Sequence, residues 1–140
     1  MHNEVEICVI HAAFESTARI VATVDIPDDM QGEADDIDAL EFAYRWTQNT
    51  TGSWSLGPKL PDSHISFQYD NADWSYRVKV LGALQTTDLG EPRGIRSTSV
   101  GDFMSISTKD GKIKRYKVAA VGFEPVEDAD FPIIEAWEED

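Results

Sequence analysis

The segment from residue 103 to residue 121 places the strongest constraint on the fold. Residues 103–108 and 114–121 have strand-like sequences, and Asp110-Gly111 lies between them. Asp-Gly favours a type I′ turn, because both positions tolerate a positive φ and the turn matches the twist of an antiparallel pair. The segment therefore predicts a β-hairpin, and with it an antiparallel sheet.

Three further segments have the pattern of strands. Residues 5–10 are apolar and rich in β-branched side chains, and residues 19–26 alternate apolar with polar positions. The link between these two runs is short enough for an antiparallel hairpin. In residues 75–84, apolar positions alternate with Arg77 and Lys79. We expect all three segments to be strands.

Residues 37–48 predict the main helix. Asp35 or Asp36 is expected to cap its free amide groups, and the local negative charge favours the positive end of the helix dipole. The apolar face is formed by Ile37, Leu40 and Tyr44. The order of strands and helix predicts an α+β fold, with a small, mostly antiparallel sheet and one main helix.

A chain of 140 residues is long enough to bury one core. We expect residues 1–130 to form a single α+β domain, followed by an acidic C-terminal tail at 131–140. Residues 49–73 predict a long loop pinned by aromatic side chains, in which 63–69 can form a short strand. The apolar residues within 131–137 are expected to dock on the domain, and the alternative is a groove on a partner.

The charge of the chain is concentrated. The net charge is −14, and residues 25–41, here the first acidic segment, hold eight acids and no Lys or Arg. Residues 124–140, the second acidic segment, hold eight more, again without a basic residue. Such a field repels nucleic acid and anionic membranes and speeds the encounter with basic protein surfaces. Solubility alone is the competing explanation.

Motifs for catalysis are not found in the sequence. There is no phosphate-binding glycine loop, and His2, His11 and His64 fit no metal-binding spacing. Cys8 lies in a strand pattern, where a buried and inert thiol is the usual case, and His11 falls on the opposite face of that strand. We therefore expect no enzyme activity, no cofactor and no metal.

The expected compartment is the cytoplasm of a bacterium or of an infected host cell. A single cysteine fits a reducing compartment, the first residues carry acids where a secretory signal needs basic groups, and no apolar run approaches membrane-spanning length.

Parts of the helix and of the last hairpin carry a distinctive set of residues. They are Leu40-Glu41, Tyr44, Thr47-Gln48-Asn49, residues 96–102, Arg115-Tyr116-Lys117-Val118 and Gly122-Phe123-Glu124. This set resembles the pattern of YodL-like small proteins. YodL-like proteins occur in bacterial mobile elements and phages. The resemblance covers about a third of the chain, and it implies a phage or mobile-element accessory protein with no catalytic residues to transfer.

The run Ser99-Val100-Gly101-Asp102 predicts a tight turn that starts the strand at 103, with Gly101 supplying an unusual backbone angle. A structural role is the favoured interpretation. The alternative is an anion site, because an arginine lies beside three hydroxyl groups. Its residues are Arg96, Ser97, Thr98 and Ser99.

The leading functional hypothesis is that an acidic surface binds a host protein with a basic surface, such as a nucleic-acid-binding defence protein, in the manner of anti-restriction or anti-CRISPR proteins. The proposed partner-binding residues are Asp28, Asp29, Asp35, Asp36, Asp38, Glu135, Glu138 and Glu139. Direct binding of nucleic acid or membrane is not expected. The alternative is a small-molecule or peptide-binding domain that uses the aromatic loop and the Arg96–Ser99 turn.

Overall fold

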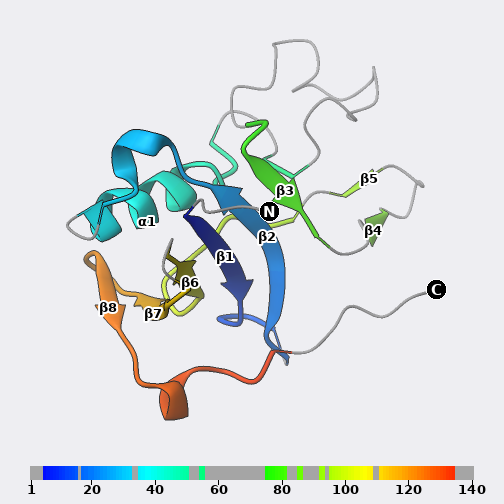
Figure 1. The fold of residues 1–140 in the computed structure, drawn as a ribbon. Coiled ribbons are helices and arrows are strands. Elements are labelled where there is room, and N and C mark those ends of the chain that lie inside the picture. The colour runs from blue at the N-terminus through cyan, green and yellow to red at the C-terminus, as the bar shows by residue number, and fades with distance from the viewer. Residues whose placement is uncertain are drawn as a thin grey trace.

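Figure 1 shows the computed structural model of the protein. The structure describes residues 5–15, 17–32, 35–50, 54–55, 75–81, 85–86, 92–93, 95–108 and 111–134.

An antiparallel sheet with one α-helix across it confirms the predicted α+β class (Figure 1). Among the described residues the sheet has six strands, in the order β3-β2-β1-β6-β7-β8. The strands are β1 Glu6–His11, β2 Arg19–Asp25, β3 Val78–Val80, β6 Phe103–Ser107, β7 Ile113–Val118 and β8 Phe123–Pro125. Within the described ranges, the helices are α1 Asp36–Arg45 and two 3-10 turns, η1 Asp28–Met30 and η4 Asp128–Asp130. A separate antiparallel pair joins β4 Gln85–Thr86 to β5 Pro92–Arg93.

The main core lies between α1 and one face of the sheet. In β1, Ile7 and Val9 pair with Ile106 and Met104 of β6, and all four side chains are at most 1% exposed. Because strand side chains alternate, these residues share a face. Helix α1 covers this face with Ala39, Leu40 and Ala43. We refer to it below as the helix face.

The opposite face of the sheet is covered by the chain that follows β8. Phe131 makes an edge-to-face contact with Phe103, with 5.4 Å between ring centroids, and the Arg115 guanidinium lies 5.3 Å from the Phe131 ring centroid. Further along, Ile134 forms a parallel bridge with Ala18. The chain through Ile134 therefore packs on the domain, as expected for the apolar part of the tail, and residues 135–140 lie outside the described residues.

Helix α1 ends three residues earlier than the predicted limit at 48. The Thr47 hydroxyl donates to the carbonyl oxygens of Ala43 and Tyr44 at 2.9 and 3.3 Å. Thr47 is fully buried, and its hydroxyl binds carbonyls that a continuing helix needs for its own amides.

The predicted cap and apolar face of α1 are both wrong in part. Asp35 holds the N-cap position without a capping bond, and its carboxylate instead accepts the Gly32 amide at 3.2 Å. Ile37 is 47% exposed, because the buried stripe of the helix is rotated away from it. That stripe consists of Ala39, Leu40 and Ala43.

The strands predicted at 5–10, 19–26, 103–108 and 114–121 are confirmed as β1, β2, β6 and β7, with one boundary to correct. Strand β7 ends at Val118 and not at 121. Residues 119–122 form a turn, in which the Ala119 amide donates to the Gly122 carbonyl at 3.0 Å and Gly122 has φ 74°. The chain then returns as β8, which the sequence pattern does not predict.

The middle of the chain differs more from the prediction. The strand expected at 75–84 is described over 75–81, and in that part Val78–Val80 pairs with β2 as β3. Strands β4 and β5 have two residues each, too few for a periodic pattern to be visible. Within the predicted loop, Trp54 is fully buried in the core, which confirms an aromatic anchor at that position. The possible strand at 63–69 and the turn residue Asp110 lie outside the described residues.

The turn predicted at residues 99–102 is confirmed. Gly101 has φ 97°, and the Asp102 amide donates to the Ser99 carbonyl at 3.0 Å. A Cβ atom at Gly101 would lie only 3.1 Å from the Cβ of Ala13, so both the backbone angle and the available space favour glycine.

Candidate functional site

Exposed carboxylates gather on η1 and on the outer side of α1. Asp28 and Asp29 are exposed in η1, and Asp38 and Glu41 are exposed in α1, which contacts η1. These four residues form what we call the acidic surface. Asp29 lies on η1 and Asp38 and Glu41 lie on α1, and Asp28 accepts a long hydrogen bond from Gln31 at 3.5 Å.

Asp36 is used to hold the helix on the sheet. Its Oδ2 atom is 2.9 Å from the Lys114 ammonium and accepts a hydrogen bond from the Tyr116 hydroxyl at 3.2 Å. Burial raises the pKa of Tyr116, and the Asp36 carboxylate raises it further. Of the predicted partner-binding acids, Asp35 and Asp36 thus make contacts within the fold, and Asp28, Asp29 and Asp38 remain on the surface.

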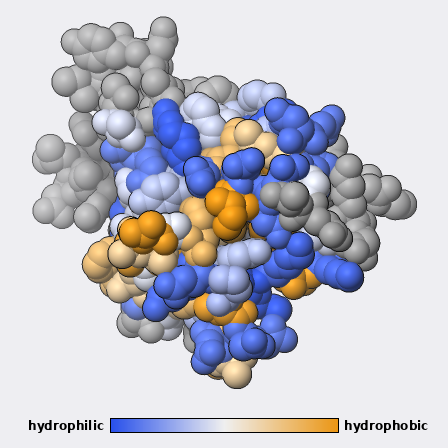
Figure 2. Space-filling model, turned by 90° about the vertical axis from the view of Figure 1, so that its left-hand side faces the viewer, coloured by the Kyte–Doolittle hydropathy of each residue, from blue (hydrophilic) through white to orange (hydrophobic). Residues whose placement is uncertain are grey.

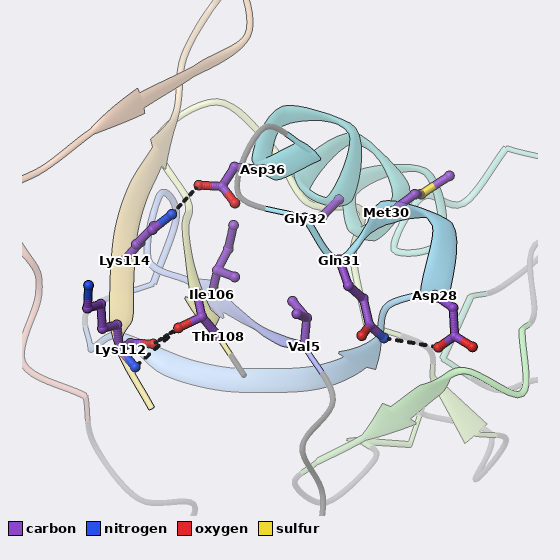
Figure 3. Close-up of a pocket in the computed structure, with 11 residues that line it drawn as sticks. Val5, Asp28, Met30, Gln31, Gly32, Asp36, Ile106, Thr108, Lys112 and Lys114 are labelled. Atoms are coloured by element: carbon purple, nitrogen blue, oxygen red, sulfur yellow. Dashed lines mark hydrogen bonds and ion pairs between the residues drawn. The ribbon is translucent and has the colours of Figure 1, made fainter. Parts of the chain in front are cut away.

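A cleft of about 490 Å³ lies beside the acidic surface, between η1, α1, strands β6 and β7 and Val5, which directly precedes β1 (Figure 3). Val5 and Ile106 point into it, the Asp36–Lys114 pair stands at one end, and Gln31 and Asp28 stand at the other. Its walls therefore carry both signs of charge over an apolar floor, and Lys114 is already paired.

A second hollow, of about 360 Å³, lies on the flank of α1 that faces β8. We call it the groove. It is lined by Glu41, Tyr44, Val100, Val118, Ala119, Ala120, Gly122 and Phe123. Figure 2 views this side of the molecule and shows apolar surface in patches among hydrophilic residues. Val100 is 52% exposed, and Val121, in the turn beside the groove, is 91% exposed.

The described part of the second acidic segment, residues 124–134, does not adjoin the acidic surface. Asp128 pairs with Arg115 of β7. Arg115 lies opposite Ser105 of β6, which alternates with the buried Met104 and Ile106, so Arg115 and Ser105 point to the sheet face opposite α1. Glu124, Glu127 and Asp130 are exposed along the same stretch of chain. The segment from 126 to 134 thus crosses the sheet face opposite α1. Glu135, Glu138 and Glu139 lie outside the described residues.

A buried carboxylate that the sequence analysis did not single out, Asp102, is the centre of a hydrogen-bond network. Its carboxylate accepts the backbone amides of Ala12, Ala13 and Ser99 at 2.8–2.9 Å, and it pairs with Arg96 at 2.7 Å. Burial raises the pKa of Asp102, but these hydrogen bonds, led by Arg96, outweigh burial and lower the pKa below its usual value. Asp102 therefore joins the β1–β2 turn to the turn before β6.

In the Arg96–Ser99 segment, the side chains of Arg96, Ser97 and Thr98 are engaged inside the protein. Arg96 binds the carboxylates of Glu15 and Asp102, so the anion beside this arginine is part of the chain itself. The Ser97 hydroxyl accepts the Asn49 amide at 2.8 Å, and the Thr98 hydroxyl is 2.8 Å from that of Thr47. These contacts support the structural interpretation of the segment over the anion-binding alternative.

His11 is buried beside this network. It is 2% exposed, its Nε2 atom is 3.0 Å from the Thr98 hydroxyl, and its ring packs edge-on against Trp54. Burial lowers the pKa of His11 to about 4, against the opposing effect of the Asp102 carboxylate 3.9 Å away. The imidazole is therefore neutral at pH 7, and its place in the core gives it no access to a substrate.

Within the described ranges, no group of three or more His, Cys, Asp or Glu side chains is placed to hold a metal ion. Burial raises the pKa of the Cys8 thiol, which keeps it protonated and unreactive. No described helix has the length and apolar character needed to cross a membrane.

Comparison with protein-family models, curated proteins and solved structures finds no match to this chain. The resemblance to YodL-like proteins stays a prediction.

Proposed function

We propose that this protein binds a partner protein with a basic surface through Asp28, Asp29, Asp38 and Glu41. The observation that carries the proposal is their common exposure on η1 and α1, in a segment of sequence that contains no Lys or Arg. Opposite charges steer association and select among partners, so this surface favours lysine- and arginine-rich partners.

The way α1 is held supports the proposal. Leu40 is fully buried in the core, and Asp36 ties the first turn of the helix to Lys114 of β7. The helix backbone that carries the exposed Asp38 and Glu41 is thereby positioned before a partner arrives. Preorganised groups lose less conformational freedom on binding, which favours affinity.

The partner class that we favour is a nucleic-acid-binding protein of a bacterial defence system. Carboxylates compete with phosphates for lysine and arginine side chains, so a row of acids can occupy a surface that normally binds DNA or RNA. Together with the YodL-like resemblance, this leads us to propose a phage or mobile-element accessory protein that inhibits a restriction or CRISPR nuclease.

Neutralising the acidic surface should weaken binding to such a nuclease. In a panel of purified restriction and CRISPR nucleases, we expect the triple variant Asp28→Asn/Asp29→Asn/Asp38→Asn to bind at least about tenfold more weakly than wild type, measured by calorimetry at low salt. The expected loss is about 0.5 kcal/mol of binding free energy or more for each charge removed.

The control is a second triple variant, Glu124→Gln/Glu127→Gln/Asp130→Asn, which changes the net charge by the same amount on the other side of the sheet. It should bind almost as tightly as wild type. If both variants weaken binding equally, only the overall charge matters and the proposed surface is wrong.

A small-molecule or peptide-binding function is the second candidate, and the cleft in Figure 3 favours it. Its volume of about 490 Å³ lies within the range typical of ligand sites. This location differs from the Arg96–Ser99 turn, where the side chains of Arg96, Ser97 and Thr98 are bonded internally. A thermal-shift screen with Lys112→Ala as the comparison tests it, because a cleft ligand should raise the Tm of wild type more than that of the variant.

A further inference from the structure

We propose that the groove beside α1 receives an apolar side chain of the basic partner, so that the partner's recognition segment is one apolar residue flanked by lysines or arginines. This inference rests on the proposed function and specifies the chemistry of its partner.

The groove has the size and lining of an anchor pocket. Val118 is 3% exposed and forms part of its lining, and the rings of Tyr44 and Phe123 meet edge-to-face with 6.3 Å between centroids. The hollow of about 360 Å³ corresponds to roughly twelve waters at about 30 Å³ each, which is enough for a leucine or phenylalanine side chain.

Exposed apolar residues lie beside the groove at positions where polar residues would serve the fold equally well. Val100 and Val121 lie in turns, at 52% and 91% exposure, and neither is needed to fill the core. Exposed apolar residues beside a hollow and bordered by polar residues are typical of protein-binding sites. A pocket that accepts a single anchor side chain is also where binding energy usually concentrates.

The charge around the groove selects the occupant. Glu41 lines the groove and also belongs to the acidic surface, and Asp38 lies one helical turn before it. At about 1.5 Å per residue, the two positions are about 4.5 Å apart along the helix axis. An extended peptide advances about 3.3 Å per residue, so a lysine next to the apolar anchor can reach these carboxylates.

A second copy of this chain is a poor occupant. Each copy has a net charge of −14, and docking another copy in the groove would bring negative charge against Glu41 and Asp38. Like charges placed together disfavour association. A basic segment removes this repulsion and gains attraction in its place.

The test uses two synthetic peptides, Lys-Lys-Lys-Leu-Lys-Lys-Lys and its serine counterpart with Ser at the centre, titrated into the full ¹⁵N-labelled chain at 50 mM NaCl. We expect the leucine peptide to bind about fivefold more tightly, because it buries part of one apolar side chain. It should shift the amide signals of residues 100 and 118–123, whereas the serine peptide should shift mainly those of 28–41.

Variants separate the groove from the acidic surface. The double variant Val100→Ser/Val121→Ser should abolish the advantage of the leucine peptide and leave the affinity of the serine peptide unchanged. Ile113→Ser is the control, because Ile113 is 54% exposed on β7 but does not line the groove. The triple variant Asp28→Asn/Asp29→Asn/Asp38→Asn should weaken both peptides.

Equal affinity of the two peptides for wild type would overturn the groove inference and leave the proposed function standing. Failure of both peptides to bind would count against the proposed function and the inference together. Groove amides that shift with protein concentration in the absence of peptide would assign the groove to self-association and also overturn the inference.

Discussion

Asp102→Ala should destabilise the protein by about 3–5 kcal/mol. The carboxylate is fully buried, and among the described residues it accepts three backbone amides and binds Arg96. Removing it leaves these amides without an acceptor and leaves Arg96, which is 26% exposed, with Glu15 as its remaining carboxylate partner. Because the amides belong to residues 12, 13 and 99, the change loosens two turns at once.

Urea denaturation followed by tryptophan fluorescence measures this loss. Asp102→Asn should be intermediate, because an amide keeps the shape but presents a donor where two acceptors are needed. Asp130→Ala removes an exposed acid and should change the free energy of unfolding by less than about 0.5 kcal/mol. A loss below about 1 kcal/mol for Asp102→Ala would contradict the structural role assigned to this carboxylate.

Acidification from pH 7 to pH 5 should lower the free energy of unfolding by about 2 kcal/mol through His11 alone. In the folded protein the pKa of His11 is about 4, whereas its ordinary value is 6.5. Between these values the unfolded chain binds a proton that the folded protein does not, so falling pH favours unfolding. The contribution of His11 to the free energy of unfolding is fully present above pH 6.5 and is lost progressively as the pH falls to about 4.

The comparison that isolates this effect is His11→Gln, which can keep a hydrogen bond to Thr98 but does not titrate. Its stability at pH 7 can be lower than that of wild type, so the measured quantity is the change between pH 7 and pH 5. We expect that change to shrink by about 2 kcal/mol in the variant. An unchanged pH dependence would mean that His11 is not held neutral in the core.

The elements that the sequence predicts well are those whose pattern is local. Strands β1, β2, β6 and β7 have enough residues for a strand pattern to be visible, and Gly101 and Gly111 lie in turns with positive φ. The end of α1 differs from the prediction because the Thr47 hydroxyl donates to a helix carbonyl oxygen. A side-chain hydrogen bond of this kind is not visible in the hydrophobic periodicity. Strand β8 was missed because it has three residues.

The candidate site depends on contacts between residues far apart in the chain, which a sequence pattern does not reveal. The exposed acids Asp28, Asp29 and Asp38 were predicted from charge alone, but the part that Asp36 plays in holding α1 depends on Lys114, 78 residues away. Asp102 likewise binds amides that lie 89 and 90 residues away. The groove combines α1 with two turns, and its one sequence signal is the placement of Val100 and Val121 in turn segments, where polar residues are usual.

The positions of the two acidic segments differ most from what the sequence suggests. The two acidic segments have the same number of acids in the sequence, yet the described part of the second crosses the face of the sheet opposite α1. The proposed binding surface is therefore confined to η1 and α1, and the acids of residues 124–130 serve as its internal control.

Salt dependence of binding tests the central claim most directly. For the nuclease in the panel that binds wild type most tightly, the dissociation constant should rise at least about tenfold between 50 and 300 mM NaCl, because salt screens exposed charges beyond a few ångströms. The rise should be clearly smaller for Asp28→Asn/Asp29→Asn/Asp38→Asn. A dissociation constant that stays constant over this range of salt would contradict recognition through the acidic surface.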